Sequence, residues 1–274
     1  TNMTGALSLS ADHVKDAKYV INCDSESIHV ICVASAGSCH MEFTRDLHRC
    51  APKGDTALTV RAHALAGGHS GEVINEGRGN AIKAVADVLY RLSEGGVEYA
   101  LADYKGGVAA NAIPSDASAV VVVAAKDVDR VKATVAAAEK DFNLVYGETD
   151  PNAVFEVTPA ALPKSVLSAE DTTSIVDVIN LLHCGVFAMD RRLPRLPALS
   201  ASLGTIETRE DVLAFQYFPR SSSDARLQAL VRVMPIMAKC TGTKVHIEKP
   251  FPAWTESKNS KLQALMADAY KDVM

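Results

Sequence analysis

The chain has 274 residues, of which 48% are hydrophobic and 22% are charged, and its formal net charge at pH 7 is −5. Such a length allows one large or two modest domains with a substantial buried core. The mild acidity argues against nucleic acid as a partner, because nucleic-acid-binding proteins favour a basic face. The sequence has no run of 18 apolar residues, so we expect no membrane span and no membrane partner.

The six cysteines are scattered through the sequence without a Cys-x-x-Cys pair. In a large chain without a secretion signal this spacing favours free thiols in a reducing compartment, and we therefore expect a cytoplasmic protein. Cys39 and His40 are adjacent, and His48 is near Cys50, but their spacing fits no common structural zinc pattern.

Near its start the chain is expected to form short elements. Ser10 is a good N-cap for a helix over residues 11–16, and apolar strands are expected at 19–22 and 28–34. Asp24 follows the first of these strands. Open α/β sheets bind ligands beyond the C-terminal ends of their strands, although a lone aspartate after a strand is more often a turn residue or a helix cap.

From residue 56 onward the hydrophobic pattern predicts a regular alternation of strands and helices. Strands are expected at 56–65, 98–105, 117–125, 153–159, 197–207, 211–218 and 243–248, with a further short strand at 143–146. Helices are expected at 80–92, 127–142, 170–183, 224–239 and 259–273. The first four of these helices each have an apolar stripe that we assign to the core.

This order spells βαββαβ twice in tandem, in residues 44–149 and 150–249, with a hinge at 147–152. The pattern is that of the split βαβ or ferredoxin-like arrangement. The predicted fold class is therefore α/β, with helices packed on one face of antiparallel sheets.

The stretch 65–81 connects an expected strand to an expected helix and contains five glycines and a single histidine, His69. Glycine permits positive φ and a close approach of the backbone. Glycines ahead of a helix can cradle a phosphate, but neither Gly-x-Gly-x-x-Gly nor Gly-x-x-x-x-Gly-Lys-Ser/Thr is present. A histidine in an arbitrary loop is more often structural than catalytic, so these residues alone leave its role open.

The same stretch reads Gly-Gly-His-Ser-Gly at 67–71 and Ile-x-x-Gly-x-Gly-Asn-Ala at 74–81. It resembles the signature of the Xaa-His dipeptidases, the bacterial carnosinase-like branch of the two-zinc metallopeptidases. Further motifs of that family occur in the family's order, at 3–6, 21–26, 111–114, 220–221 and 251–254. Several spaced motifs in one order are more specific than any one of them alone.

The resemblance implies that residues 44–249 are a lid and dimerisation domain of two ferredoxin-like units, inserted into an α/β zinc-peptidase catalytic domain. Residues 1–43 and 250–274 would belong to that catalytic domain. The family's adjacent glutamates, its His-x-Asp segment and its last metal-binding histidine do not occur in this sequence. We therefore expect an internal piece of a longer enzyme, inactive by itself, in which Asp24 is a ligand of one of two zinc ions and the other ligands lie elsewhere.

The resemblance also implies roles for residues of the lid. His69 would donate to the substrate's carbonyl oxygen in the transition state, often from the neighbouring subunit of a dimer. Asn111 would hydrogen-bond the substrate, and Arg220 would bind its C-terminal carboxylate with the planar guanidinium. Where the family tends to have Ser-x-Asn-x-Gly, residues 200–204 read Ser-Ala-Ser-Leu-Gly, so that Ser202 takes the asparagine position and changes the expected substrate contact.

The leading hypothesis is zinc-dependent hydrolysis of Xaa-His dipeptides by a cytoplasmic enzyme that forms a homodimer through its lid. A related tripeptidase, a general dipeptidase or an amino-acid deacylase would use the same scaffold on another substrate. A non-catalytic dimerisation module, which keeps the lid and lacks the zinc site, is the third hypothesis.

Overall fold

The computed structural model describes residues 8–23, 30–191, 193, 195–254, 257 and 259–273. Its contacts divide the chain into a larger part, residues 36–254, and a smaller part that combines 1–35 with 255–274. This division falls near the predicted boundaries at residues 43 and 250. That the smaller part belongs to a catalytic domain stays a prediction. No described helix is long and apolar enough to cross a bilayer.

Two helices, η1 and α6, are described in the smaller part. In η1 (Ala11–His13) the Ser10 hydroxyl accepts a hydrogen bond from the Asp12 amide at 3.2 Å, which confirms Ser10 as the N-cap. The helix itself is shorter than the predicted 11–16. α6 (Lys261–Val273) confirms the last predicted helix. The strand predicted at 19–22 is wrong, because these residues are exposed and form no strand. Residues 30–34 form none either, and 28–29 lie outside the described residues.

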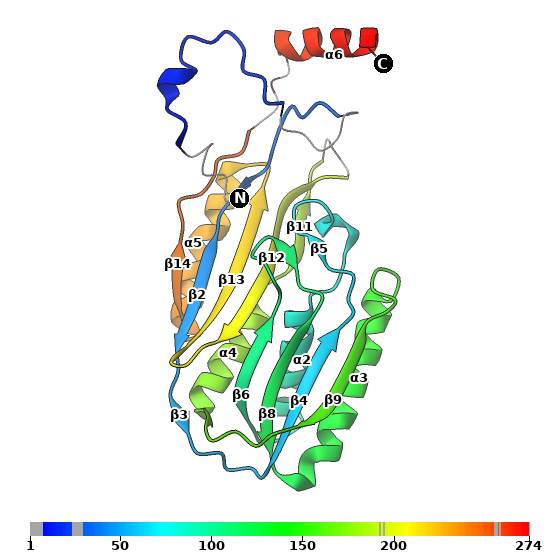
Figure 1. Ribbon diagram of the computed structural model, residues 1–274, viewed down its shortest axis with the longest axis vertical. Helices are drawn as coiled ribbons and strands as arrows, with labels where there is room; N and C mark the ends of the chain where they lie inside the picture. The colour runs from blue at the N-terminus through cyan, green and yellow to red at the C-terminus, as the bar shows by residue number, and fades with distance from the viewer. Residues whose placement is uncertain are drawn as a thin grey trace. The chain divides into compact units, whose positions relative to one another are not determined.

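The larger part is built on one antiparallel sheet, whose strands follow the order β14-β2-β13-β12-β6-β8-β4-β9 (Figure 1). The bounds along this path are β14 (Lys244–Ile247), β2 (Met41–Asp46), β13 (Val212–Ser221), β12 (Pro197–Thr208), β6 (Tyr99–Gly106), β8 (Ala117–Val123), β4 (Thr56–His63) and β9 (Val154–Ala160). Off the path, β1 (Gly37–Ser38) pairs with β13 and β11 (Gly185–Met189) pairs with β12. Two short pairs join β3 (Arg49–Cys50) to β10 (Val166–Leu167) and β5 (Gly68–His69) to β7 (Ala112–Ile113).

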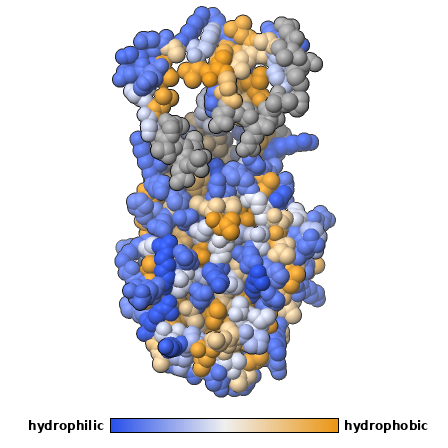
Figure 2. Space-filling view, viewed as in Figure 1, coloured by the Kyte–Doolittle hydropathy of each residue, from blue (hydrophilic) through white to orange (hydrophobic). Residues whose placement is uncertain are grey.

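Four helices cover one face of this sheet in the described part of the chain (Figure 1). They are α2 (Ala81–Glu94), α3 (Val128–Tyr146), α4 (Ala169–Leu181) and α5 (Asp224–Cys240). The core between helices and sheet includes Leu89, Val121, Ile175 and Phe215, all fully buried. The apolar stripes predicted for the helices are thus largely confirmed as core, and the six cysteines are free thiols as predicted. Figure 2 shows that the opposite face, which carries no helices, is mostly hydrophilic with small apolar patches.

The sheet combines two ferredoxin-like units of the same topology. The inserted unit consists of β4, α2, β6, β8, α3 and β9, and the split unit consists of β2, α4, β12, β13, α5 and β14. In each unit the first strand lies between the fourth and the third. The units join where β6 pairs with β12 and α2 packs against α4. At this junction the Lys83 ammonium donates to the carbonyl oxygens of Ile179 at 2.7 Å and Asn180 at 2.8 Å.

The two units are nested, so the prediction of tandem repeats with a hinge at 147–152 is wrong. β9 was predicted to open the second repeat, but it pairs with β4 along its whole length and closes the inserted unit. The first strand of the split unit is β2, which pairs with β13 and β14 and spans the boundary predicted at residue 43. Alternating residues predict a strand and its buried face, but they do not select its partner.

A second local correction concerns the strand predicted at 143–146. These residues form the last turn of α3, where the rings of Phe142 and Tyr146 lie with their centroids 4.7 Å apart. Leu-Val-Tyr favours a strand by propensity, but packing of the preceding turns on the core continues the helix.

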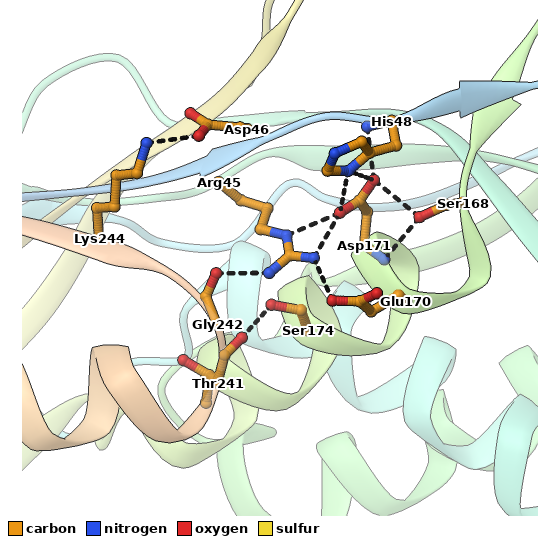
Figure 3. A network of polar contacts seen from close by, with 10 residues as sticks. All are labelled: Arg45, Asp46, His48, Ser168, Glu170, Asp171, Ser174, Thr241, Gly242 and Lys244. Carbon is orange, nitrogen blue, oxygen red and sulfur yellow. Dashed lines mark hydrogen bonds and ion pairs between the residues drawn. The ribbon is translucent and has the colours of Figure 1, made fainter.

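A buried polar network closes the split unit where β2 meets the start of α4 (Figure 3). The Arg45 guanidinium donates to Asp171 at 2.7 Å, to Glu170 at 3.0 Å and to the Gly242 carbonyl at 2.5 Å. The Asp171 carboxylate also accepts from the His48 amide at 2.6 Å and from the Ser168 hydroxyl at 2.8 Å. Each buried charge therefore has a partner, as burial of charge requires.

Candidate functional site

The loop that connects β4 to α2, residues 64–80, is named here the His69 loop. It begins with Ala64, whose φ of 59° lies in the left-handed region, and continues with Gly67 and Gly68 at 60° and 119°. His69 then pairs with Ala112 in the short ladder of β5 and β7. An alanine with positive φ is strained, so the surrounding contacts have to hold this backbone in place.

Arg78 is one of the residues that hold the loop. Its guanidinium donates to the Gly67 carbonyl at 2.5 Å and to the Glu76 carboxylate at 2.6 and 2.8 Å. A Cβ atom at Gly68 would lie 2.7 Å from an Arg78 nitrogen, so the guanidinium would have to move, and the φ of 119° also disfavours any side chain there. Glycine at this position therefore allows the guanidinium to lie directly against the backbone.

The structure brings His69 and Arg220 together at Gly71. A Cβ atom built on Gly71 would lie 3.0 Å from Cε1 of His69 and 3.2 Å from Cζ of Arg220. His69 belongs to the inserted unit, whereas Arg220 is on β13 of the split unit. The two residues predicted to act on the substrate are thus neighbours within one chain, and a Cβ atom at Gly71 would require both side chains to shift slightly.

The Arg220 guanidinium lies over the Phe218 ring, with Cζ 4.6 Å from the ring centroid. Its Nε is buried and has no hydrogen-bond partner, and no ion pair among the described residues includes Arg220. Burial lowers the pKa of Arg220 from its ordinary value, yet an arginine remains charged at neutral pH. A desolvated cation without a counter-ion is suited to bind an anionic group such as a carboxylate.

The His69 imidazole is partly exposed, with 40% of its side chain accessible. Its Nδ1 is 3.8 Å from the Glu72 carboxylate, too long for a hydrogen bond but close enough to orient the ring. The structure shows no hydrogen bond of the imidazole to another described residue. An imidazole of this kind can donate a hydrogen bond to a carbonyl oxygen.

The other predicted site residues have different surroundings. Asn111 is exposed beside the loop, and its backbone carbonyl accepts hydrogen bonds from the Ser70 amide and hydroxyl, both at 2.9 Å. Ser202 is only 1% exposed, and its hydroxyl contacts the Leu203 carbonyl and the Asn80 amide group. The structure therefore leaves the Ser202 hydroxyl inside the fold, in contact with the residue that caps α2, and it does not bring Ser202 to the surface with His69.

The predicted metal ligand Asp24 lies outside the described residues. Among the residues that the structure describes, no group of three or more His, Cys, Asp or Glu side chains could hold a metal ion. The described part of the chain therefore does not form a zinc site by itself.

Sequence reasoning did not identify Gly71, Phe218 or Arg78 as parts of the site. Phe218 is two residues before Arg220 on one strand, so strand periodicity places both on the same face and could have indicated their contact. Nothing in the sequence pattern indicates that Gly71 separates an imidazole from a guanidinium, because these come from strands of different units.

Comparisons with known proteins show what the chain is similar to. The peptidase dimerisation domain of the M20 peptidases matches residues 62–150, which include the His69 loop. Together with the relatives described next, this match supports a resemblance to the M20 peptidases and to the Xaa-His dipeptidases among them.

The chain is 27% identical to the cytosol non-specific dipeptidase of Escherichia coli (strain K12) over 272 residues, which cover 98% of this chain and 55% of that protein. Its fold matches the crystal structure of aminoacylhistidine dipeptidase from Vibrio alginolyticus with a TM-score of 0.81 and 24% identity, over 88% of this chain and 49% of that one. The chain thus spans about half the length of the relatives it matches.

Proposed function

We propose that this chain supplies the substrate-binding lid of a dipeptidase, in which Arg220 binds the C-terminal carboxylate and His69 stabilises the oxyanion. The observation that carries the proposal is the meeting of the His69 imidazole and the unpaired Arg220 guanidinium at Gly71. Both groups are donors, one always cationic, and they are held side by side. A dipeptide offers a carboxylate and a peptide carbonyl at a similarly short spacing.

Each side chain has a distinct part in the proposed reaction. Arg220 binds the substrate carboxylate through its planar fork, and the Phe218 ring beneath it restricts the orientation of the guanidinium. His69 donates a hydrogen bond from Nε2 to the carbonyl oxygen, and this hydrogen bond becomes stronger as negative charge develops on the oxygen. The Asn111 side chain, exposed beside the His69 loop, adds a hydrogen bond to the substrate backbone.

Three finer features of the proposal rest on the family resemblance. The complete enzyme would hold two zinc ions, with Asp24 as one ligand, and zinc would activate the attacking water. The enzyme would be a cytoplasmic homodimer, and Xaa-His dipeptides would be among its substrates. The curated relative is named a non-specific dipeptidase, which supports a wider range of dipeptides.

The test measures hydrolysis of carnosine-like and unrelated dipeptides by the full-length protein, with and without a chelator. His69→Ala should lower kcat by about 100- to 1,000-fold, as loss of one oxyanion donor does. Arg220→Ala should raise KM by about 10- to 100-fold, because one charged hydrogen-bonding partner is lost. His246→Ala, which removes an exposed histidine of β14, and Arg209→Ala are the matched controls. Full activity in His69→Ala would exclude the proposed role.

A further inference from the structure

Asp150 is a buried carboxylate that the proposed reaction does not use. It lies in the turn that follows α3, and only 1% of its surface is accessible. Its own backbone amide donates to the Tyr146 carbonyl at 2.7 Å, which ties the turn to the end of the helix. The side chain therefore projects from a fixed backbone.

The carboxylate binds both ends of the His69 loop. One oxygen accepts a hydrogen bond from the Ala66 amide at 2.7 Å, and the other accepts one from the Gly79 amide at 2.8 Å. The Thr149 hydroxyl donates to the second oxygen at 3.1 Å and also contacts the Gly77 carbonyl at 3.3 Å. Residues on both sides of His69 are thus bonded to a single side chain.

Two ordinary roles for a buried aspartate do not apply here. The N-cap of α2 is Asn80, whose side chain accepts from the Lys83 amide, so Asp150 does not cap that helix. Among the described residues Asp150 also takes part in no ion pair, in contrast to Asp171, which pairs with Arg45. Its hydrogen-bond partners are the loop backbone and its neighbour Thr149.

We propose that Asp150 is a positioning residue, which fixes the His69 loop so that the imidazole stays beside Gly71 and Arg220. This inference rests on the proposed function for its effect on catalysis. An ionised carboxylate accepts at both oxygens, so it can bind two backbone amides at once. The strained Ala64 lies just before the first of these amides, and loss of either hydrogen bond leaves one end of the loop less firmly held.

The first experiment compares Asp150→Asn with wild-type protein by hydrogen exchange in the full-length chain. Asparagine has nearly the same size, but it presents an NH2 group to one of the two amides and cannot accept from it. Whichever amide faces the NH2 group, that of residue 66 or that of residue 79, should then exchange about 10- to 100-fold faster, as expected for a lost hydrogen bond. Asp127→Asn is the matched control, because that buried aspartate contacts Arg130 and not the loop.

The second experiment measures kcat and KM for a dipeptide. Asp150→Asn should lower kcat by about 10- to 100-fold, since displacement of a catalytic group by about 1 Å has effects of this size, while KM stays near the wild-type value. In a His69→Ala background the same substitution should have no further effect on kcat, because its target is already absent.

The two experiments separate failure of the inference from failure of the proposed function. Unchanged exchange at 66 and 79 in Asp150→Asn would overturn the inference whatever the protein hydrolyses. Faster exchange with equal, additive losses of kcat in the presence and absence of His69 would show that Asp150 does not act through His69, and would overturn it too. Faster exchange in a protein that hydrolyses no dipeptide would support the positioning of the loop and reject the proposed function.

Discussion

The inserted and split units have the same strand order, but they are closed by different interactions. The inserted unit is continuous in sequence, and its closure uses close packing and a carboxylate that binds backbone amides. The split unit is interrupted by the whole inserted unit, so that Arg45 and Asp171, which close it, are 126 positions apart. Where the chain does not keep two elements together, a buried and fully bonded ion pair fixes which strand meets which helix.

The units also differ in what they contribute to the site. The inserted unit provides His69 from a long glycine-rich loop between its first strand and first helix. The split unit provides Arg220 from the end of its third strand, where the connection to α5 is only a few residues long. The same topology thus places the imidazole on a long connection and the guanidinium at the end of a strand.

Of the substitutions that test this comparison, Asp171→Ala in the split unit should have the largest effect on stability. The substitution leaves the Arg45 guanidinium buried without its main partner and removes the acceptor for the His48 amide. We expect the free energy of unfolding to fall by about 3–5 kcal/mol, the usual result of breaking a buried pair by removing one partner. Urea unfolding of the full-length protein would measure it.

The exposed pair of Lys244 and Asp46 in the same network is the control (Figure 3). Lys244→Ala should change stability by no more than about 0–1 kcal/mol, because exposed ion pairs contribute little. Equal effects of Asp171→Ala and Lys244→Ala would contradict the importance of the buried pair.

A smaller effect is expected from Gly79→Ala in the inserted unit. A Cβ atom at Gly79 would overlap the ring of Phe142 on α3. Overpacking of this kind costs about 1–3 kcal/mol. Phe142→Leu in the same chain should recover part of the loss, which a thermal-unfolding comparison of the single and double variants would detect.

Gly77→Ala provides the matched control for that prediction. Gly77 has a φ of 72° and nothing within 4 Å of an added Cβ atom, so its cost is conformational, about 1 kcal/mol, and Phe142→Leu should not relieve it. Relief of both variants by Phe142→Leu would show that the overlap with the ring is not the cause.

The smallest effect is expected in the response to acid of the carboxylate that closes the split unit. Burial favours the neutral form of Asp171, but hydrogen bonds from the His48 amide, Arg45 and Ser168 outweigh it and hold the pKa of this carboxyl below its usual value. A lowered pKa gives stability that is present above the unfolded pKa of about 3.9 and is lost as pH falls through the folded value. Stability below about pH 4 should therefore decline less steeply in Asp171→Asn than in the wild type, as pH-dependent urea unfolding would show.

Much of the fold follows from the sequence because its strands and helices are strongly patterned. The predicted helix at 80–92 is α2 with Asn80 as its N-cap, and the bounds of β12 and α5 agree to within one residue at either end. The nesting could not be predicted in this way. Both β2 and β9 are short alternating strands, and the choice of β4 as the partner of β9 depends on contacts far apart in sequence.

For the site, the sequence predicted individual residues but not their arrangement. His69 and Arg220 come from motifs that carry a family resemblance, but no spacing in the sequence indicates that they meet at Gly71. Ser202 occupies a motif position whose hydroxyl the fold turns toward Asn80. A motif locates a residue in the chain, whereas its exposure depends on the strand register and on the neighbouring elements.

The pairing of β6 with β12 affects how this site can move. Because these strands exchange backbone hydrogen bonds and α2 packs on α4, the units cannot rotate against each other without breaking bonds in the middle of the sheet. The imidazole and the guanidinium are therefore carried by two units that share one sheet. On the proposed function, the separation between them would set the distance that a ligand needs between its anionic end and its reacting group.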